Sequence, residues 1–242
     1  GHIHEESGLT IIDISITKNV ASMLLSVFIL LLVLIYVAKR YEKNQNAPNG
    51  LQAFLEPLIL FVKKDIIQDN IGVRYEKYTP FLLTVFFFIL INNLLGLLPG
   101  AANVTGNIAV TFVLSVFTFI ITSLSGNKNY WGHIFKPPGV PLALMPIMVP
   151  IEIIGIFTKP FALMIRLFAN ISAGHIIILS LISLIFIAQS SMGDIGAWSV
   201  APVSVLFVLF IYCIELLVAF LQAYIFTLLS AVFIGLAVAE DH

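Results

Sequence analysis

Residues 147–188 form one almost wholly apolar stretch, and its length constrains the fold more than any other feature of the chain. As a helix rising ~1.5 Å per residue, it would be ~60 Å long, whereas the hydrocarbon core of a bilayer is only ~30 Å thick. The stretch must therefore break into two spans or cross the bilayer at a strong tilt. A second apolar run, 199–239, is also too long for one upright crossing.

The composition places the whole chain in a membrane. Of its 242 residues, 60% are hydrophobic and only 10% are charged, with a mean hydropathy of +1.05. Soluble domains carry about 25% charged residues. The net charge of −1 gives no reason to expect a nucleic-acid partner. The G-x-x-x-x-G-K-[ST] pattern is absent, so we expect no nucleotide site, and the single Cys213 is expected to serve packing.

The spacing of apolar and polar runs predicts an all-α, polytopic fold in a single membrane domain over residues 1–242, with about five crossings. Upright crossings are expected at 21–38, 80–98 and 106–125, and the runs 147–188 and 199–239 count as one crossing each. Because the turn at 189–198 is short, the two long helices are expected to form an antiparallel hairpin.

Residues 50–67 are predicted to form an amphipathic helix in the membrane interface. Gln52, Glu56 and Lys63 share one helical face, and apolar side chains occupy the opposite face. The alternative is an amphipathic helix packed on a soluble side of the protein.

Basic residues predict the orientation of the chain. They cluster between the first two crossings, and Lys128 and Lys136 lie between the third and fourth, whereas loops 99–105 and 189–198 contain none. Because Lys and Arg mark the cytoplasmic or matrix side, we expect the N-terminus outside and the C-terminus inside.

The start of the chain carries two further expectations. Gly1 in place of Met suggests a removed signal or transit segment, or an arbitrary boundary. His2, His4, Glu5 and Glu6 are metal-ligand types, but a flexible end is the simpler interpretation, so neither a metal nor a cofactor is predicted.

A polar stripe runs along the first long apolar stretch. Glu152, Lys159 and Arg166 step by seven residues, and Asn170 returns to the same face, whereas His175 falls nearly opposite Arg166. An arginine near the bilayer centre costs at least ~2.5–3.5 kcal/mol, so such charges are usually functional.

The second long run has a matching stripe, in which Glu215 and Gln222 share a face. Counting back from a hairpin near residue 193 places His175 and Glu215 at similar depth, and Arg166 and Gln222 in a deeper layer.

These residue types point to proton transfer. An imidazole and a carboxylate at one depth suit a proton relay, and Glu152 supplies a second carboxylate on the other side. Arg166 cannot lose its proton, so it interrupts the path and requires a carboxylate from another chain. Alternatively, Glu152 and Lys159 pair for assembly.

Other polar side chains have simpler interpretations. Lys159 is expected to be structural or interfacial more than a proton carrier. Asn92 and Asn93, inside the second crossing, are expected to make helix–helix hydrogen bonds, with an accessory role in the path as the alternative.

Four segments resemble subunit a of the rotary F-type ATP synthases. RLFANISAGH at 166–175 is similar to its signature, and Glu215 followed by LQAYIF at 221–226 is similar to its last helix. NNLLGLLP at 92–99 and PGVPL at 138–142 also fit.

The resemblance implies a long tilted hairpin against a ring of c subunits, with b-type peripheral-stalk subunits, other ATP synthase subunits and membrane lipids as further partners. It implies that Arg166 is the essential arginine facing the ring carboxylate. Asn170, His175, Glu215 and Gln222 would line the half-channel open to the outside, and Glu152 would belong to the inner one. In some bacterial members the acid and the histidine are exchanged at positions 175 and 215.

Sequence reasoning therefore predicts the stator half of a proton turbine, a non-catalytic subunit in a bacterial plasma membrane or an organellar inner membrane. A proton-coupled secondary transporter is the alternative, but it predicts an internal repeat and a midplane substrate cavity, and the sequence has no visible repeat. A purely structural subunit would leave Arg166 and Glu215 unexplained.

Overall fold

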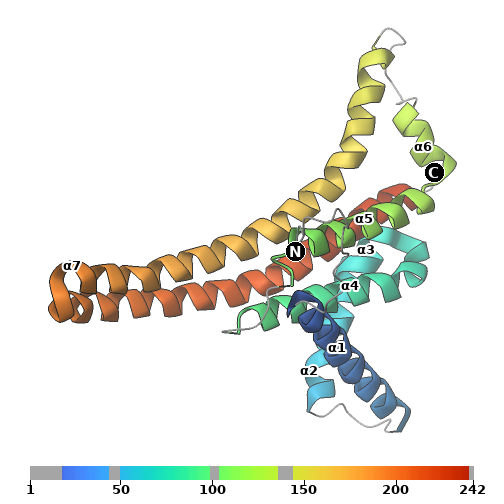
Figure 1. Ribbon diagram of the computed structural model, residues 1–242. Helices are drawn as coiled ribbons and strands as arrows, with labels where there is room; N and C mark the ends of the chain where they lie inside the picture. Colours follow the sequence, from blue (N-terminus) through green and yellow to red (C-terminus); the bar gives the residue numbers. More distant parts are fainter. Residues whose placement is uncertain (1–17, 44–49, 99–103, 136–143, 240–242) are drawn as a thin grey trace, which may run out of the picture.

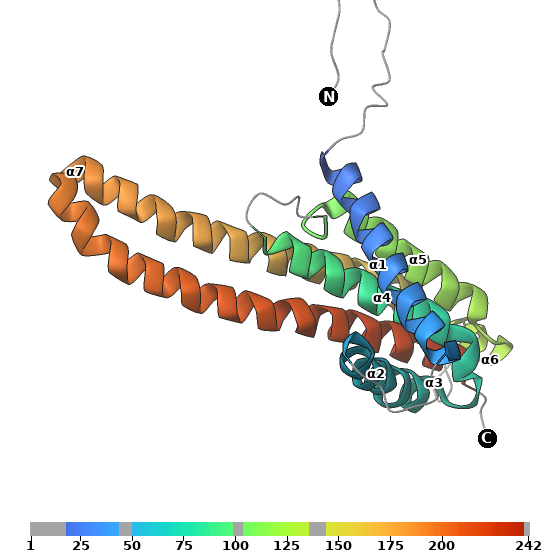
Figure 2. The same ribbon diagram turned by 90° about the horizontal axis from the view of Figure 1, so that it is seen from below.

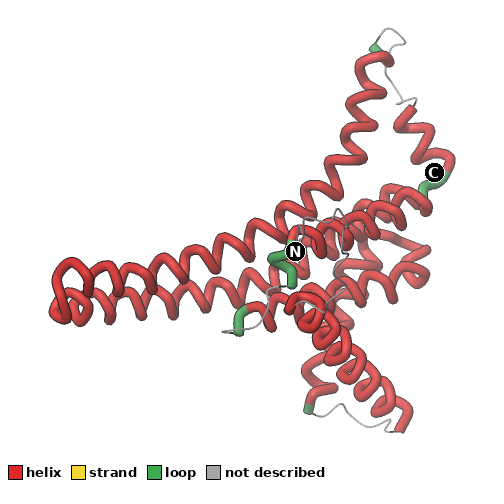
Figure 3. Tube along the Cα trace, viewed as in Figure 1, coloured by secondary structure: helices red, strands yellow, loops and turns green. Residues whose placement is uncertain are grey.

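The computed structural model describes residues 18–43, 50–98, 104–135 and 144–239. Every regular element in these ranges is a helix, which confirms the all-α prediction (Figure 3). Three helical segments within them are long and apolar enough to cross a membrane: Gln52–Gly96, Ile108–Ser125 and Met145–Val238. Val20–Tyr36 is a shorter apolar helix. The candidate metal ligands His2, His4, Glu5 and Glu6 and the motif at 138–142 lie outside the described residues.

The helices follow one another with short connections (Figure 1). They are α1 (Lys18–Lys43), α2 (Leu51–Phe61), the π-helical η1 (Val62–Gln68), α3 (Asp69–Ile71), the 3₁₀ turn η2 (Gly72–Arg74), α4 (Tyr75–Gly96), α5 (Ile108–Ser125), α6 (Lys128–Phe135) and α7 (Met145–Val238).

Three boundaries differ from the sequence predictions. Helix α4 starts before Pro80, which lies inside it rather than opening it. The expected interfacial helix 50–67 changes at Val62 from α to π geometry. Residues 128–135 form a helix between the predicted crossings 106–125 and 147–188, where no helix was predicted, because their polar and aromatic composition gives no apolar run long enough to mark one.

Helix α7 is a hairpin rather than a single rod. Gly193 has φ 66° and ψ −158°, in the left-handed half of conformational space that glycine adopts without a steric penalty. The chain reverses at this one residue, and not over the ten-residue turn expected at 189–198. From the turn onward the two arms, 145–192 and 194–238, lie side by side (Figures 1 and 2), whereas the yellow start of the first arm bends away from the second arm (Figure 1). Each arm is ~70 Å long at 1.5 Å per residue. This length favours one tilted crossing per arm over a break of the arm into two spans.

The core lies where α4 and η1 meet both arms of α7, at the end of the hairpin away from Gly193. Its fully buried members are apolar and come from elements far apart in the sequence: Val62, Ile66, Ile67, Leu82, Phe86, Ile89, Leu163, Leu167, Phe226 and Ile234. The tip of the hairpin, in contrast, projects away from the other helices in both views. The core therefore holds the open end of the hairpin, and the turn at Gly193 lies outside the core.

Two contacts hold the C-terminal end of α7. The backbone N–H and side-chain Nδ2 of Asn127 donate to the carbonyl oxygens of Ala237 (2.9 Å) and Val238 (3.0 Å). On another side, Gly235 lies directly against the backbone of Asn70 in α3. Both contacts satisfy or approach main-chain atoms at the end of the helix, so they fix its position rather than its side chains.

Replacing Gly235 by alanine should destabilise the protein. The added Cβ would overlap the carbonyl oxygen of Asn70, which is backbone and cannot rotate away. We expect a loss of about 1–3 kcal/mol, typical of overpacking, seen as a lower thermal unfolding temperature in detergent. Gly132→Ala is the control, because its Cβ would meet no atom within 4 Å. Equal unfolding temperatures for the two variants would contradict this packing.

Candidate functional site

Arg166 lies on the first arm of α7, partly buried at the edge of its packed face. Within the described part of the chain, no Asp or Glu lies within ion-pair distance of its guanidinium. Ala162, Ala169 and Ala173 follow the same helical face at spacings of four and seven residues, and all three are exposed. Small side chains allow another helix to approach closely, so the surface around this charge is open to a partner.

Asn170, one turn after Arg166, connects the two arms. Its Nδ2 donates a hydrogen bond of 2.9 Å to Oε1 of Gln222, which is buried on the second arm. Counting residues from the turn placed Gln222 level with Arg166, but the structure gives it Asn170 as its partner. Asn170 lies one helical turn closer to Gly193 than Arg166 does, so the two arms are offset by about one turn from the register that the residue count predicted.

His175 and Glu215 line one small cavity together with Asn170, as their matched depth predicted. The cavity leaves about 20 Å³ for the centre of a water molecule, which is room for roughly one. The carboxylate of Glu215 packs against Gly174, where a side chain would occupy its place. The absence of a side chain at residue 174 therefore sets where this carboxylate lies.

Helix α4 supplies the third wall of the cavity. Asn93 lines it, and its Nδ2 donates 3.1 Å to the carbonyl oxygen of Ala219 on α7. This bond is the helix–helix contact that the sequence analysis expected. Asn92 instead donates 2.8 Å to Phe88 O within its own helix. Of the two asparagines, only Asn93 therefore joins the residues of the predicted path.

Three buried polar atoms around this cavity have no hydrogen-bond partner among the described residues: Oδ1 of Asn93, Oε2 of Glu215 and Nε2 of Gln222. Leaving such a group unpaired costs about 1–3 kcal/mol, and buried polar groups are normally satisfied by protein or water. Acceptors and a donor arranged around a water-sized space are the surroundings that a buried water requires.

Gly174→Ala should impair the site without unfolding the protein. The new Cβ would overlap Oε1 of Glu215 and lie 2.8 Å from its Cδ, but these atoms end a flexible side chain that can move. We expect proton flux through the reconstituted complex to fall by roughly tenfold, since misplacing a group by ~1 Å can cost up to ~10²-fold. Gly155→Ala, on the same arm with open space around its Cβ, should keep full flux. If the two variants conduct equally, Gly174 does not position Glu215.

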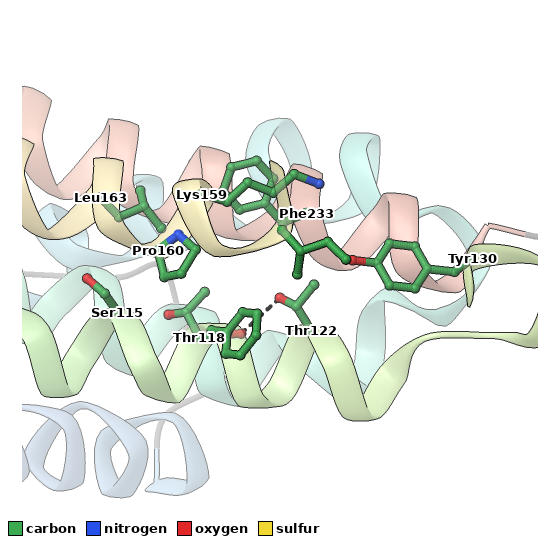
Figure 4. A pocket seen from close by; sticks show the side chains of 10 residues that line it. Ser115, Thr118, Thr122, Tyr130, Lys159, Pro160, Leu163 and Phe233 are labelled. Carbon is green, nitrogen blue, oxygen red and sulfur yellow. Dashed lines mark hydrogen bonds between the residues drawn. The ribbon is translucent and has the colours of Figure 1, made fainter. Parts of the chain in front are cut away.

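The inner part of the stripe has different surroundings. Glu152 is exposed. Lys159 faces a seam between α5 and α7, where its Nζ lies 5.2 Å from the ring centroid of Phe233 (Figure 4). Burial raises the pKa of Tyr130 on α6, and the nearby Glu152 carboxylate raises it further. Glu152 and Lys159 form no ion pair in the described structure, so the assembly-pair alternative has no contact behind it.

Polar residues of α5 line the seam, but their hydroxyl groups are bonded to the backbone of their own helix. Ser115, Thr118 and Thr122 of α5 line it, and each donates to a carbonyl four residues earlier, at 2.8, 3.1 and 2.8 Å. Figure 4 draws the bond from Thr122. Hydroxyls bonded in this way act as small packing side chains, so the seam is a helix–helix contact.

Sequence reasoning missed two contributors to these surroundings. Gly174 stands beside His175 in the motif, but only the facing arm reveals that it makes room for Glu215. Tyr130 lies between two predicted crossings, where no helix was predicted, so nothing in the sequence connected it with Glu152. A small residue next to an ionisable one in a membrane helix is the only signal that could have drawn attention to Gly174.

Comparison with known proteins identifies the family. The family described as ATP synthase A chain matches residues 20–235. ATP synthase subunit a of Chloroherpeton thalassium is 51% identical over 95% of this chain and 69% of that protein. The Chlorobium phaeobacteroides protein of the same name is 53% identical, over 95% and 68%. That of Myxococcus xanthus is 46% identical, over 96% and 75%. The chain therefore belongs to the family of ATP synthase subunit a, a multi-pass membrane component of F-type ATP synthases that has the other subunits of that complex as its partners.

Proposed function

We propose that this chain is the proton-translocating stator subunit of its ATP synthase. It provides two offset half-channels, and Arg166 separates them and faces a carboxylate on the rotating c-ring. The observation that carries the proposal is the setting of Arg166: a permanent charge in an apolar helix, with no acid of the described chain beside it and exposed alanines around it. Such a charge requires a counter-charge, and a partner surface is free to bring one.

The outer half-channel is assigned to the cavity between α4 and the two arms of α7. Asn93, Asn170, His175 and Glu215 line it, and Gln222 is bonded to Asn170. An imidazole and a carboxylate are both groups that can carry a proton, so a water between His175 and Glu215 would complete a relay. A proton entering there reaches the depth of Arg166 within about two helical turns.

The inner half-channel is assigned to the exposed side of α7 near Glu152, where this chain forms one wall and the rotor the other. The α5–α7 seam does not serve this purpose, because its hydroxyls are bonded to their own helix. Lys159 lies in that seam over an aromatic ring, so we assign it a structural role.

The mechanism follows from the charges. A proton passes from His175 and Glu215 to a rotor carboxylate, which becomes neutral and can move into lipid. After a rotation, the carboxylate meets Arg166, and the ion pair favours its charged form and drives the proton off toward Glu152. Each charge crossing 100 mV supplies ~2.3 kcal/mol, so several crossings must be summed through rotation.

The remaining assignments complete the proposal. The N-terminus lies outside and the C-terminus on the cytoplasmic side, following the basic loops. The chain crosses the bilayer about five times, and α2 with η1 lies in the interface. Besides the c-ring, b-type subunits of the peripheral stalk bind it, in a bacterial plasma membrane or an organellar inner membrane.

Disulfide cross-linking tests the rotor interface. With Cys213 replaced by serine, the chain contains no other cysteine. Ala169→Cys should cross-link to a cysteine placed next to the rotor carboxylate in the assembled complex. Leu124→Cys on α5, which is 82% exposed, should not. Cross-linking at residue 124 but not at residue 169 would contradict the assignment of the rotor to the face of α7 that carries Arg166.

A further inference from the structure

The tip of the α7 hairpin, residues 189–198, has a surface that the proposed proton path does not use. Three large apolar side chains are exposed there: Met192 at 72%, Ile195 at 80% and Trp198 at 79%. The tip lies apart from every other labelled helix in both views (Figures 1 and 2).

The same ten residues are also polar. Gln189, Ser190, Ser191 and Asp194 are all exposed. Asp194 is the only charged side chain between residues 176 and 214. A carboxylate held in the hydrocarbon would be costly, so Asp194 must reach water. Exposed Met192 and Ile195, two and one residues away along the turn, favour an apolar environment instead.

The turn is compact enough to hold both kinds of side chain in place. Gly196 is buried, and a Cβ there would lie 2.6 Å from both the carbonyl oxygen of Ala188 and the Cβ of Met192. The two arms therefore meet closely just behind Gly193. Polar and apolar side chains extend from one small, closed turn, and they share nearly the same depth.

We propose that the tip is a membrane anchor that lies at the boundary between lipid headgroups and acyl chains. Its occupant is the lipid of one leaflet, and not a second protein. The boundary is the place where a charged group can be hydrated within a few ångströms of buried apolar side chains. Tryptophan favours the same position, because its ring is apolar and its N–H requires a hydrogen-bond partner.

The anchor would act on the rest of the protein through the rigid arms. His175 lies 18 residues from Gly193 and Glu215 lies 22, so the tip is ~27–33 Å of helix away from the cavity. The core holds the opposite end of α7. A hairpin held at both ends keeps a fixed tilt in the bilayer.

Tryptophan fluorescence tests the depth directly, because the chain has only two tryptophans, Trp131 and Trp198. The Trp131→Phe variant of this chain, in which Trp198 is the remaining tryptophan, is reconstituted in phosphatidylcholine bilayers with bromine atoms near the headgroup or near the chain end. We expect the shallow bromines to quench Trp198 at least about twice as strongly as the deep ones. The Trp198→Phe variant measures the contribution of Trp131. Stronger quenching by deep bromines, or no quenching by either lipid, would overturn the proposal.

A spin label distinguishes lipid from a protein partner in the complete ATP synthase. A nitroxide is attached at Ser191→Cys in the Cys213→Ser background, and its collisions with oxygen and with a water-soluble nickel complex are measured. Collisions with both reagents, as found at a bilayer boundary, support the anchor. Protection from both reagents in the complex would mean that another subunit covers the tip, and the lipid assignment would be wrong. The assay does not depend on proton transport, so its result is separate from that of the proposed function.

Discussion

Replacing Arg166 by alanine should abolish ATP-driven proton pumping and proton-driven ATP synthesis. Without the guanidinium, nothing forces an arriving rotor carboxylate to release its proton, so we expect the coupled rate to fall by about 10²-fold or more. The barrier between the half-channels would disappear too, so protons should leak passively. Quenching of a pH-sensitive dye in inverted vesicles measures pumping, and its recovery after an imposed gradient measures the leak.

Lys159→Ala is the matched control for this loss. Lys159 is a second cation on the same stripe, seven residues away, but it lies over the ring of Phe233 in the α5–α7 seam. Its removal should change the pumping rate by less than about twofold, with any effect limited to stability, since a cation–π contact is worth ~0.5–2 kcal/mol. Normal pumping by the Arg166→Ala variant would refute the proposal that Arg166 separates the half-channels, whatever the pumping rate of the Lys159→Ala variant.

The second large effect is expected at the outer cavity. Glu215→Gln removes a group that can carry a proton and keeps its size, so we expect proton flux to fall by about 10–10²-fold. Combining His175→Glu with Glu215→His restores one imidazole and one carboxylate to the same cavity and should recover part of the flux. The passive proton flux through the membrane sector, reconstituted without the catalytic head, reports on this step.

Asp194→Asn provides the comparison, because it neutralises a carboxylate of the same hairpin that lies at the tip and not in the cavity. Its flux should equal that of the unmodified protein. If the exchanged double variant conducts no better than either single variant, His175 and Glu215 do not act as a pair, although both line the cavity.

Much of the fold could be predicted because the bilayer leaves few choices. Chains of apolar residues must be helical in lipid, so the length of each run fixes the helix that it forms. This reasoning predicted the antiparallel hairpin and the meeting of His175 with Glu215, since depth along two helices needs only a residue count.

The details that the sequence did not predict depend mostly on contacts between distant segments. The partner of Gln222 depends on the offset between the two packed arms, which a residue count from the turn does not give. The sequence also indicated a ten-residue turn, whereas the chain reverses at Gly193 alone. The π-helical geometry of η1 arises where three consecutive charged residues, Lys63, Lys64 and Asp65, lie between buried Val62 and Ile66. The spacing of apolar residues does not distinguish this geometry from an ordinary α-helix. The space at Gly174 is defined by a side chain 41 positions away, so local pattern could not reveal it.

The one-residue reversal at Gly193 has a consequence for how such a protein can vary in length. An insertion of one residue between Gly193 and Glu215 would turn the carboxylate ~100° round its helix and shift it by ~1.5 Å. A change in one arm must therefore be matched by an equal change in the other, since seven residues would restore the facing but move the carboxylate by ~10 Å along the helix. Natural insertions and deletions in this family should accordingly occur as balanced pairs flanking the hairpin glycine, and engineered ones that are unbalanced should uncouple the motor.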